Sequence, residues 1–190
     1  MNTNLAYQEE PRYEIIGGKV VMMASPTLAH IFIAVNIYNI FHQFLRGKKC
    51  TAIPDRAALH LVKGGERYEP DMMVVCDPEK IDREKGVFGA PDLVVEILSP
   101  GTARYDRGHK FRAYERSGVR EYWIVSQKER SVEQYVLEDG RFSLREVYTY
   151  FTEAQLADME PEEREQVQTE FRCTLFEDLS IRLEDIFYNA

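Results

Sequence analysis

Two carboxylates stand within apolar stretches of the sequence, where an ionised side chain is costly. Asp71 directly precedes the apolar run Met72–Cys76, and Glu96 interrupts the run Leu93–Leu98. Burying an unpaired charge costs several kcal/mol, so each acid is expected to pair with a cation or to bind a metal. For Glu96 taken alone, an ion pair with a neighbouring lysine or arginine is the favoured explanation.

The two acids taken together indicate a site for a divalent cation. Two carboxylates on adjacent strands can converge on Mg²⁺, which prefers oxygen ligands and completes its shell with water and phosphate. Lys110 follows Glu96 on the next expected helix, close enough along the chain to fold back over the end of the strand. Taken alone, Lys110 favours a simpler role, a surface pair with Asp106 one turn earlier that contributes about 0.3 kcal/mol.

His30 and Tyr114 are accessory candidates for the same site. His30 opens the first long helix and can reach the site from the side, although a polar residue at a helix start is at least as good an explanation. Tyr114 lies one turn after Lys110, and packing against the core is its favoured role.

The elements that must hold these residues alternate between strands and helices. Apolar residues at helical spacing predict a helix over 28–45 that packs deep against a sheet, and a second helix is expected over 103–116, ended by Gly118. Strands are expected over 13–16, 20–23, 50–53, 56–62, 68–76, 93–98, 121–125, 132–137 and 142–148, with turns at Gly17-Gly18, Gly64-Gly65 and Asp139-Gly140. This order predicts an α/β fold, a mixed sheet flanked by helices, with an N-terminal β-hairpin and a C-terminal β-meander.

The net charge is concentrated at the C-terminal end. The 190 residues include 24 Lys and Arg against 32 Asp and Glu, a formal charge of −8, and residues 151–190 carry all of it. Residues 151–170 form a polar acidic stretch, either a solvated helix or a loop, and residues 171–190 regain apolar character and are expected to pack back on the body. The length fits a single domain over 1–190 with its core at about 13–148. The overall sign excludes a histone-like polycation.

One segment of the neutral body is basic. Residues 101–120 contain six bases against two acids, and three of the bases, Arg104, Arg107 and Arg112, are candidates for contact with a nucleic-acid backbone. A solvated helix face explains the charge count equally well.

Cysteine usage and the N-terminus indicate a cytoplasmic protein. Cys50, Cys76 and Cys173 are scattered and lack CxxC spacing, so all three are expected to be reduced and partly buried. Residues 1–10 are polar and acidic rather than basic and then apolar, unlike a signal peptide. No apolar run approaches the roughly 20 residues of a membrane span, so no membrane partner is expected.

The combined pattern resembles the PD-(D/E)XK nuclease superfamily and, more specifically, the Uma-two family of restriction endonuclease-like proteins. The resemblance covers roughly residues 13–148. The segments that carry it are, in chain order, YEIIGGKV (13–20), YEPDMMVVCD (68–77), GAPDLVVEILSPGT (89–102) and YDRGHKFRAYERSGVREYWIV (105–125).

The resemblance implies a restriction-endonuclease-like fold and a hydrolase that cleaves DNA with Mg²⁺ or Mn²⁺. It makes Asp71 the first motif acid and Glu96 the second, with the backbone carbonyl of Ile97 completing the metal ligands. The motif lysine belongs two residues after the second acid, where this sequence has Leu98. The resemblance then points to Lys110 on the following helix as the third catalytic residue. A homodimer would suit cleavage of two strands, and no organic cofactor is implied.

Two classes of function remain open at the level of the sequence, beside a purely structural protein in which a partner such as Lys110 simply neutralises Glu96. The first is a metal-dependent endodeoxyribonuclease, favoured by the retained acids. The second is a nuclease fold that no longer cleaves and serves as a nucleic-acid-binding or dimerisation module, favoured by Leu98 at the motif position.

Overall fold

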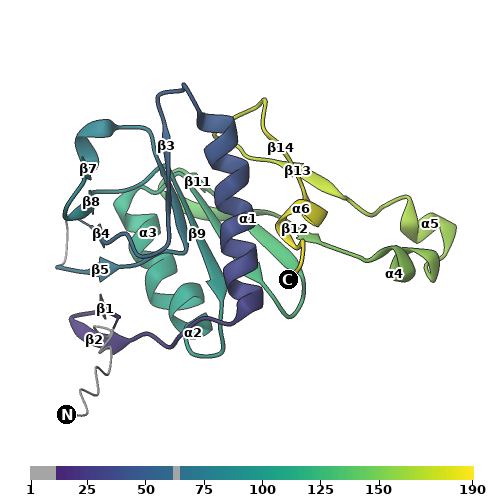
Figure 1. Cartoon of the computed structure of the whole chain (residues 1–190), viewed down its shortest axis with the longest axis horizontal. Coiled ribbons are helices and arrows are strands. Elements are labelled where there is room, and N and C mark those ends of the chain that lie inside the picture. The colour runs from purple at the N-terminus through teal and green to yellow at the C-terminus, as the bar shows by residue number, and fades with distance from the viewer. Residues whose placement is uncertain (1–11, 62–64) are drawn as a thin grey trace, which may run out of the picture.

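The computed structural model describes residues 12–61 and 65–190 (Figure 1). The polar N-terminal residues 1–10, the end of the strand expected over 56–62 and the turn at Gly64 lie outside the described residues.

The structure has two six-stranded sheets in its described part, and the one with the longer strands is the mixed sheet that the sequence predicts. We call it the larger sheet. Its strand order is β12-β11-β10-β9-β6-β3, in which β9 and β10 run parallel and the other neighbours run antiparallel. The strands are β3 (Thr51–Pro54), β6 (Met72–Val75), β9 (Leu93–Leu98), β10 (Glu121–Ser126), β11 (Ser131–Glu138) and β12 (Arg141–Thr149). Its central strands β6, β9 and β10 are almost fully buried, which explains their nearly continuous apolar sequence.

A second sheet of short strands, in the order β2-β1-β5-β4-β8-β7, was only partly expected from the sequence. Its strands are β1 (Tyr13–Ile16), β2 (Lys19–Met22), β4 (Leu59–His60), β5 (Arg67–Tyr68), β7 (Ile81–Asp82) and β8 (Gly86–Phe88), and a 3₁₀ turn, η1 (Pro78–Lys80), precedes β7. The single strand expected over 68–76 is wrong, because the chain leaves β5 at Glu69-Pro70 and enters β6 in the other sheet. Pro70 has no amide hydrogen to donate to a ladder, which favours a break at this point.

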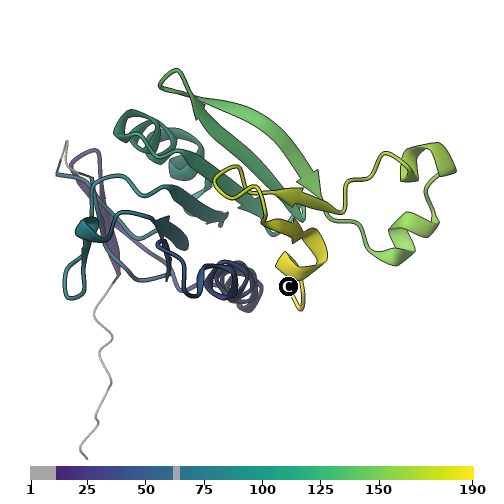
Figure 2. The same cartoon turned by 90° about the horizontal axis from the view of Figure 1, so that it is seen from above.

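The helix predicted over 28–45 is α1 (Leu28–Leu45), and it covers one face of the larger sheet (Figures 1 and 2). Thr27 caps it by accepting a hydrogen bond from the amide of His30. Ile33, Ile37 and Phe41 are fully buried in the core on that face. By length and composition alone α1 meets the criterion for a membrane-spanning helix, a criterion that core helices packed on a sheet also meet.

The second predicted helix is interrupted by a π-helical turn. It consists of α2 (Ala103–Tyr105), the π turn η2 (Asp106–Lys110) and α3 (Phe111–Ser117), and Gly118 ends it with a φ of 87°. These segments cover the opposite face of the sheet from α1, where Tyr114 packs with Tyr122 (Figure 2). A π turn accommodates one extra residue, and such insertions are frequent at functional sites.

The C-terminal segment packs back on the body, as the sequence predicts. The acidic stretch forms two short helices, α4 (Glu153–Ala157) and α5 (Pro161–Arg164), which project from the body as an arm (Figure 1). After the arm, β13 (Glu170–Arg172), β14 (Ser180–Arg182) and α6 (Leu183–Ile186) complete the chain. Phe171, Ile181 and Ile186 are buried in the same core as α1.

The expectation of three reduced cysteines is wrong for two of them. Cys50 and Cys76 form a disulfide, whereas Cys173 is free and buried. The register of β3 against β6 pairs Thr51 with Val75, so the residues just outside this pair face each other across the two strands.

Candidate functional site

Asp71, Glu96 and Lys110 line one cavity of about 760 Å³. The end of β9 and the following loop form one wall, the N-terminus of α1 forms another, and the chain between β2 and α1 closes the third side. The structure thus brings the three sequence-predicted residues together: Asp71 directly precedes β6, Glu96 lies on β9 and Lys110 ends the π turn η2.

Strand register explains why the two acids meet. Strand β6 pairs with β9 in antiparallel fashion, with Met72 opposite Val95, and continuing that register by one residue places Asp71 opposite Glu96. Residues opposite each other on adjacent antiparallel strands point to the same face of a sheet. In place of a further ladder bond, the Asp71 side chain accepts a hydrogen bond of 2.6 Å from the backbone amide of Ile97.

Lys110 is buried rather than exposed, which contradicts the surface pair that its sequence context favours. Its side chain is 1% exposed, and its Nζ lies 2.9 Å from Oε1 of Glu14, 3.0 Å from Oε1 of Glu96 and 3.3 Å from Oδ1 of Asp106. The helical pair with Asp106 therefore exists, but as one part of a buried cluster of three carboxylates around one ammonium.

Glu14 is the residue of this cluster that the sequence reasoning missed. It lies on β1, is 1% exposed, lines the cavity and also accepts a hydrogen bond of 2.9 Å from the amide of Glu69. The signal that singled out Glu96, an acid within an apolar strand, is also present in the stretch Tyr13–Ile16. The shortness of that stretch, in a hairpin with one exposed strand, made its burial invisible from the sequence.

The cluster carries more negative charge than Lys110 balances. Burial raises the pKa of Glu96 well above its usual value, against the attraction of Lys110, and burial likewise raises the pKa of Asp106. Burial alone would lower the pKa of Lys110, but the attraction of Glu96, Asp106 and Glu14 prevails and raises that pKa well above its usual value. Lys110 is therefore firmly protonated, and the surrounding acids favour either protons or an added cation.

Tyr114 contacts the cluster directly, in addition to packing in the core. Its hydroxyl donates a hydrogen bond of 2.7 Å to Oε1 of Glu96, the same oxygen that faces Lys110. Burial raises the pKa of Tyr114 well above its usual value, so the hydroxyl keeps its proton and remains a donor. The two donors fix the orientation of the Glu96 carboxylate.

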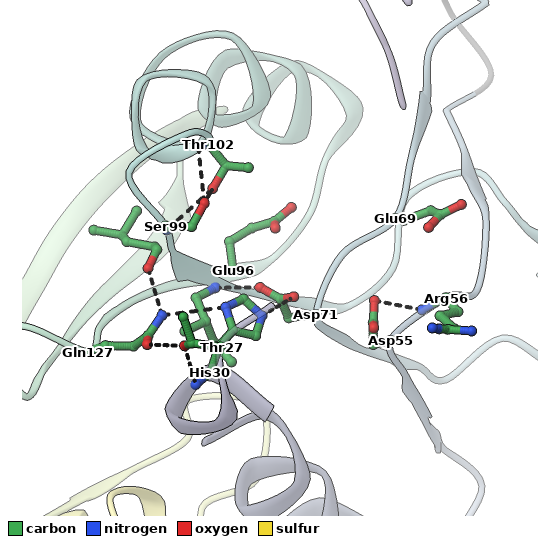
Figure 3. A network of polar contacts seen from close by, with 12 residues as sticks. Thr27, His30, Asp55, Arg56, Glu69, Asp71, Glu96, Ser99, Thr102 and Gln127 are labelled. Atoms are coloured by element: carbon green, nitrogen blue, oxygen red, sulfur yellow. Dashed lines mark hydrogen bonds and ion pairs between the residues drawn. The ribbon is translucent and has the colours of Figure 1, made fainter. Parts of the chain in front are cut away.

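His30 reaches the site from the N-terminus of α1 (Figure 3). Its Nε2 lies 2.8 Å from Oδ1 of Asp71, and its Nδ1 lies 3.5 Å from Nε2 of Gln127. Gln127 is anchored in turn, because it donates to the carbonyl of Leu98 at 3.0 Å and accepts a hydrogen bond from Thr27. Burial alone would lower the pKa of His30, but the hydrogen bond to Asp71 and its charge prevail and raise it.

The three arginines proposed to contact nucleic acid do not line the cavity. Arg104, Arg107 and Arg112 are exposed on the segments that follow β9. Arg107 forms a two-pronged ion pair with Glu133, in which Nη1 lies 2.7 Å from Oε2. Arg104 lies over the ring of Tyr105, 5.5 Å from its centroid. Arg107 is thus already paired, whereas Arg104 and Arg112 project into solvent.

The donor chemistry of the cavity fits a hard divalent cation. Asp71, Glu96 and Glu14 supply carboxylate oxygens to its lining, whereas Asp106 lies outside the lining and faces Lys110, with Oδ1 3.3 Å from Nζ. Within residues 12–61 and 65–190, no three acidic, histidine or cysteine side chains are grouped closely enough to hold a metal by themselves. A cation here would therefore complete its shell with backbone, water and phosphate oxygens, as Mg²⁺ commonly does.

Comparisons with known proteins show which family the chain matches. The chain matches the Uma2 family, described as "Putative restriction endonuclease", over residues 3–171. Two proteins of Synechocystis sp. are similar over 130 residues, 67% of this chain: uncharacterized protein slr1290 is 32% identical over 67% of its own length, and uncharacterized protein sll1609 is 23% identical over 73%.

A solved structure shares the fold. It is described as "a putative nuclease belonging to DUF820" from Anabaena variabilis, and it superposes with a TM-score of 0.68. The match covers 94% of this chain and 91% of the other at 19% sequence identity. The two chains thus share one fold over nearly their whole length. By the extent of the sequence match, the chain belongs to the Uma2 family of restriction endonuclease-like proteins.

Proposed function

We propose that the protein is a metal-dependent endonuclease that hydrolyses phosphodiester bonds in DNA. The observation that carries this proposal is the position of Asp71 opposite Glu96 at the wall of a cavity that also holds the buried Lys110. Three features from separate elements meet there, although each has an ordinary structural explanation when taken alone. Membership of the family supports the nuclease class, and the surplus of carboxylates supports the need for a cation.

The residues of the cavity divide the work as follows. A bound Mg²⁺ or Mn²⁺ would polarise a phosphoryl oxygen and lower the pKa of a coordinated water. Asp71 and Glu96 supply carboxylate ligands, together with the backbone carbonyl of Ile97. Lys110 stabilises the charge that develops on the phosphate or orients the attacking water, and Tyr114 holds the Glu96 carboxylate in place. His30 holds Asp71 on its other side.

The substrate and the assembly are part of the proposal. Arg104 and Arg112 extend from the same segment that supplies Lys110, so a DNA backbone that enters the cavity passes within their reach. Cleavage of both strands of a duplex takes two such sites. We therefore propose that the active unit is a homodimer. Light scattering of the purified protein measures its oligomeric state directly.

One observation favours the second candidate, a nucleic-acid-binding module without cleavage. Both oxygens of Asp71 are already engaged, one by His30 and the other by the amide of Ile97, so the carboxylate is satisfied without a metal. Leu98 also replaces the lysine of the basic motif.

A metal titration with a cleavage assay separates the two candidates. Wild type is expected to nick supercoiled plasmid with Mg²⁺ or Mn²⁺ and to stop when the metal is chelated. Asp71→Asn and Glu96→Gln are expected to lower the cleavage rate by at least about a hundredfold, because each removes a charged ligand. Glu138→Gln, which changes an exposed acid at the end of β11, is the charge-matched control and should cleave normally. Metal-independent nicking, or equal rates in all variants, would rule the proposal out.

A further inference from the structure

A second hollow lies outside the cavity of the proposed nuclease site, and its charge and its aromatic surface suggest a ligand. It has a volume of about 820 Å³ and is lined by the turn between β3 and β4 and by β7, β8 and their connection. The lining contains four bases and two acids, together with one pair of aromatic rings, and its bases are Arg56, Arg67, Arg83 and Lys85. We call it the basic hollow.

Three of the four bases are free to hold an anion. Arg56, Arg83 and Lys85 are exposed, and none forms an ion pair with a residue in the described part of the chain. Arg67 is occupied, since it pairs with Glu69 at 2.7 Å and lies over the ring of Tyr13.

The two acids offset only part of this charge, and neither forms an ion pair with the three free bases. The Asp82 side chain accepts hydrogen bonds from the amides of Glu84 and Lys85 within its own turn, at 2.9 and 3.0 Å. Glu84 is exposed on the same turn and forms no ion pair with any residue in the described ranges. The hollow therefore keeps an excess of positive charge.

The aromatic pair at the hollow is partly exposed. His60 and Phe88 stack with their ring centroids 4.7 Å apart and their planes 14° from parallel. Phe88 lines the hollow and 42% of this residue is exposed, so part of its surface remains open to a ligand. His60 is held by a contact of 3.2 Å between its Nε2 and the carbonyl of Lys85, so the pair forms a fixed platform rather than two mobile rings.

An aromatic platform flanked by unpaired cations is the combination that binds single-stranded nucleic acid. Bases stack on the ring, and the cations follow the phosphates of the backbone, whatever the sequence. A duplex would supply the phosphates but would keep its bases stacked on each other and away from Phe88. We propose that the basic hollow binds an unpaired nucleotide segment of a nucleic-acid strand, with a base on Phe88 and its phosphates at Arg83, Lys85 and Arg56.

The hollow is connected to the proposed nuclease site by one layer of ion pairs. Arg12 lines the nuclease cavity and bonds to both Asp55 and Glu69, and Arg56 of the hollow follows Asp55 directly in the chain. Figure 3 shows Asp55, Arg56 and Glu69 on the side of Asp71 away from His30 and Gln127. That the bound nucleic-acid strand is part of a nuclease substrate rests on the proposed function. The binding of a single strand to the hollow does not rest on it.

Fluorescence anisotropy without divalent metal tests the proposal. The probes are a labelled single-stranded oligothymidylate and a blunt duplex of the same length. Phe88→Ala is expected to weaken binding of the single strand by about fivefold or more, the lower end of what one stacked base contributes, and to leave the duplex nearly unaffected. Arg83→Ala/Lys85→Ala should weaken the single strand and reduce the slope of log affinity against log salt by about 1.4. The matched control, Arg145→Ala/Arg172→Ala, removes two exposed bases from the C-terminal half and should leave single-strand binding unchanged.

Further variants keep the result interpretable. Phe88→Leu retains an apolar side chain but not a ring, so it should bind the single strand as weakly as Phe88→Ala, and thermal melting shows that both variants are folded. Equal single-strand affinity in Phe88→Ala and wild type would overturn the proposal, even if the arginine and lysine changes weakened binding. Cleavage by wild type separates the two hypotheses. Single-strand binding that depends on Phe88, in a wild-type protein that shows no metal-dependent cleavage, would support the hollow and overturn the nuclease. Metal-dependent cleavage with single-strand affinity independent of Phe88 would do the reverse.

Discussion

Nζ of Lys110 lies 2.9 Å from Oε1 of Glu14, and both side chains are 1% exposed. This contact joins the N-terminal hairpin to the helical segment that follows β9. The hairpin therefore supplies a carboxylate to the same ammonium that faces Glu96, and the integrity of the cavity depends on a residue far away in the chain.

Replacement of Lys110 tests how far the cluster depends on its single cation. Lys110→Met is expected to lower the free energy of unfolding by about 3–5 kcal/mol, because it leaves buried carboxylates without a partner. The pKa values of Glu96 and Asp106 are already raised by burial, and they rise further in the variant. An acid whose pKa is raised by folding destabilises the native state as pH rises above its unfolded value. The loss should thus be largest near neutral pH and should shrink as pH falls below about 4, where both acids become protonated in the unfolded state as well.

Urea unfolding across that pH range measures the difference. Lys110→Met/Glu96→Gln is the companion variant and should recover part of the lost stability. A stability loss that does not change with pH would contradict the assignment of a charge imbalance.

Tyr114→Phe isolates the hydrogen bond to Glu96. Removing the hydroxyl leaves the ring in the core and should cost about 1–3 kcal/mol, the range for a hydrogen bond to a charged or buried partner. The cleavage rate should fall more than metal affinity does, because the carboxylate keeps its charge but loses its fixed orientation. Isothermal titration with Mn²⁺ and plasmid nicking report the two quantities. Wild-type cleavage by a folded Tyr114→Phe would show that the hydroxyl has no positioning role.

Glu121 is expected to be the most sensitive structural acid on β10. Its side chain is fully buried and accepts hydrogen bonds from the indole of Trp123, from Gln134 and from the amides of Thr174 and Leu175. Glu121→Gln turns one acceptor into a donor that faces other donors, so it should cost about 2–4 kcal/mol.

Trp123 is the single tryptophan and gives a direct signal. Its fluorescence should change in Glu121→Gln, and limited proteolysis should cut the C-terminal segment more readily. The neighbouring change Glu138→Gln is the control, since Glu138 is exposed at the far end of β11. A native-like spectrum and unchanged protection in Glu121→Gln would argue against this anchoring role.

The ion pair between Arg107 and Glu133 predicts a small pH-dependent stabilisation. Burial would raise the pKa of Glu133, but the hydrogen bond and charge of Arg107 prevail and lower it. Because the folded pKa lies below the unfolded one, the stabilisation is present above pH of about 4.3 and is lost as pH falls through the folded value. Arg107→Ala should cost only about 0.5 kcal/mol near neutral pH, since the arginine is largely exposed and screened. Thermal melting at low and neutral pH measures the difference in stability between wild type and Arg107→Ala. This difference should shrink on acidification, and a difference that grows would contradict the prediction.

The acidic arm is expected to weaken non-specific DNA binding. Replacing 152–168 by a short Gly-Ser link removes most of the acids of the arm while keeping β12 and β13. Affinity for a random duplex should rise at low salt and converge with wild type at high salt, where the Debye length falls to about 3 Å. Unchanged or weaker binding in a folded variant would show that the arm is electrostatically irrelevant.

The sequence predicts best what local pattern determines. Periodicity placed α1 to the residue, and the buried strand around Glu96 emerged as β9 because an apolar run with one acid has few alternative structures. Asp71 and Glu96 were expected to converge from resemblance and strand order, and the register of β6 against β9 accounts for their meeting.

What the sequence left undetermined depends on long-range pairing. The burial of Glu14 comes from docking of the hairpin against Lys110, and nothing within the hairpin itself encodes that contact. The exit of the chain at Pro70 into a second sheet and the disulfide between Cys50 and Cys76 likewise follow from which strands become neighbours. Composition and spacing carry little information about such neighbours.

The π turn between Asp106 and Lys110 affects how the residues before and after it are oriented around the helix axis. One surplus residue is stored there, and it sets the rotational phase of everything downstream relative to everything upstream. Deleting a single residue from the turn would leave the composition and the charge almost unchanged, yet it would turn one half of the segment by about 100° relative to the other. Lys110 and Tyr114 would then no longer both point toward Glu96. In an alignment of relatives, a one-residue gap at this turn would therefore mark a chain that has the same residue types but not the same arrangement of their side chains.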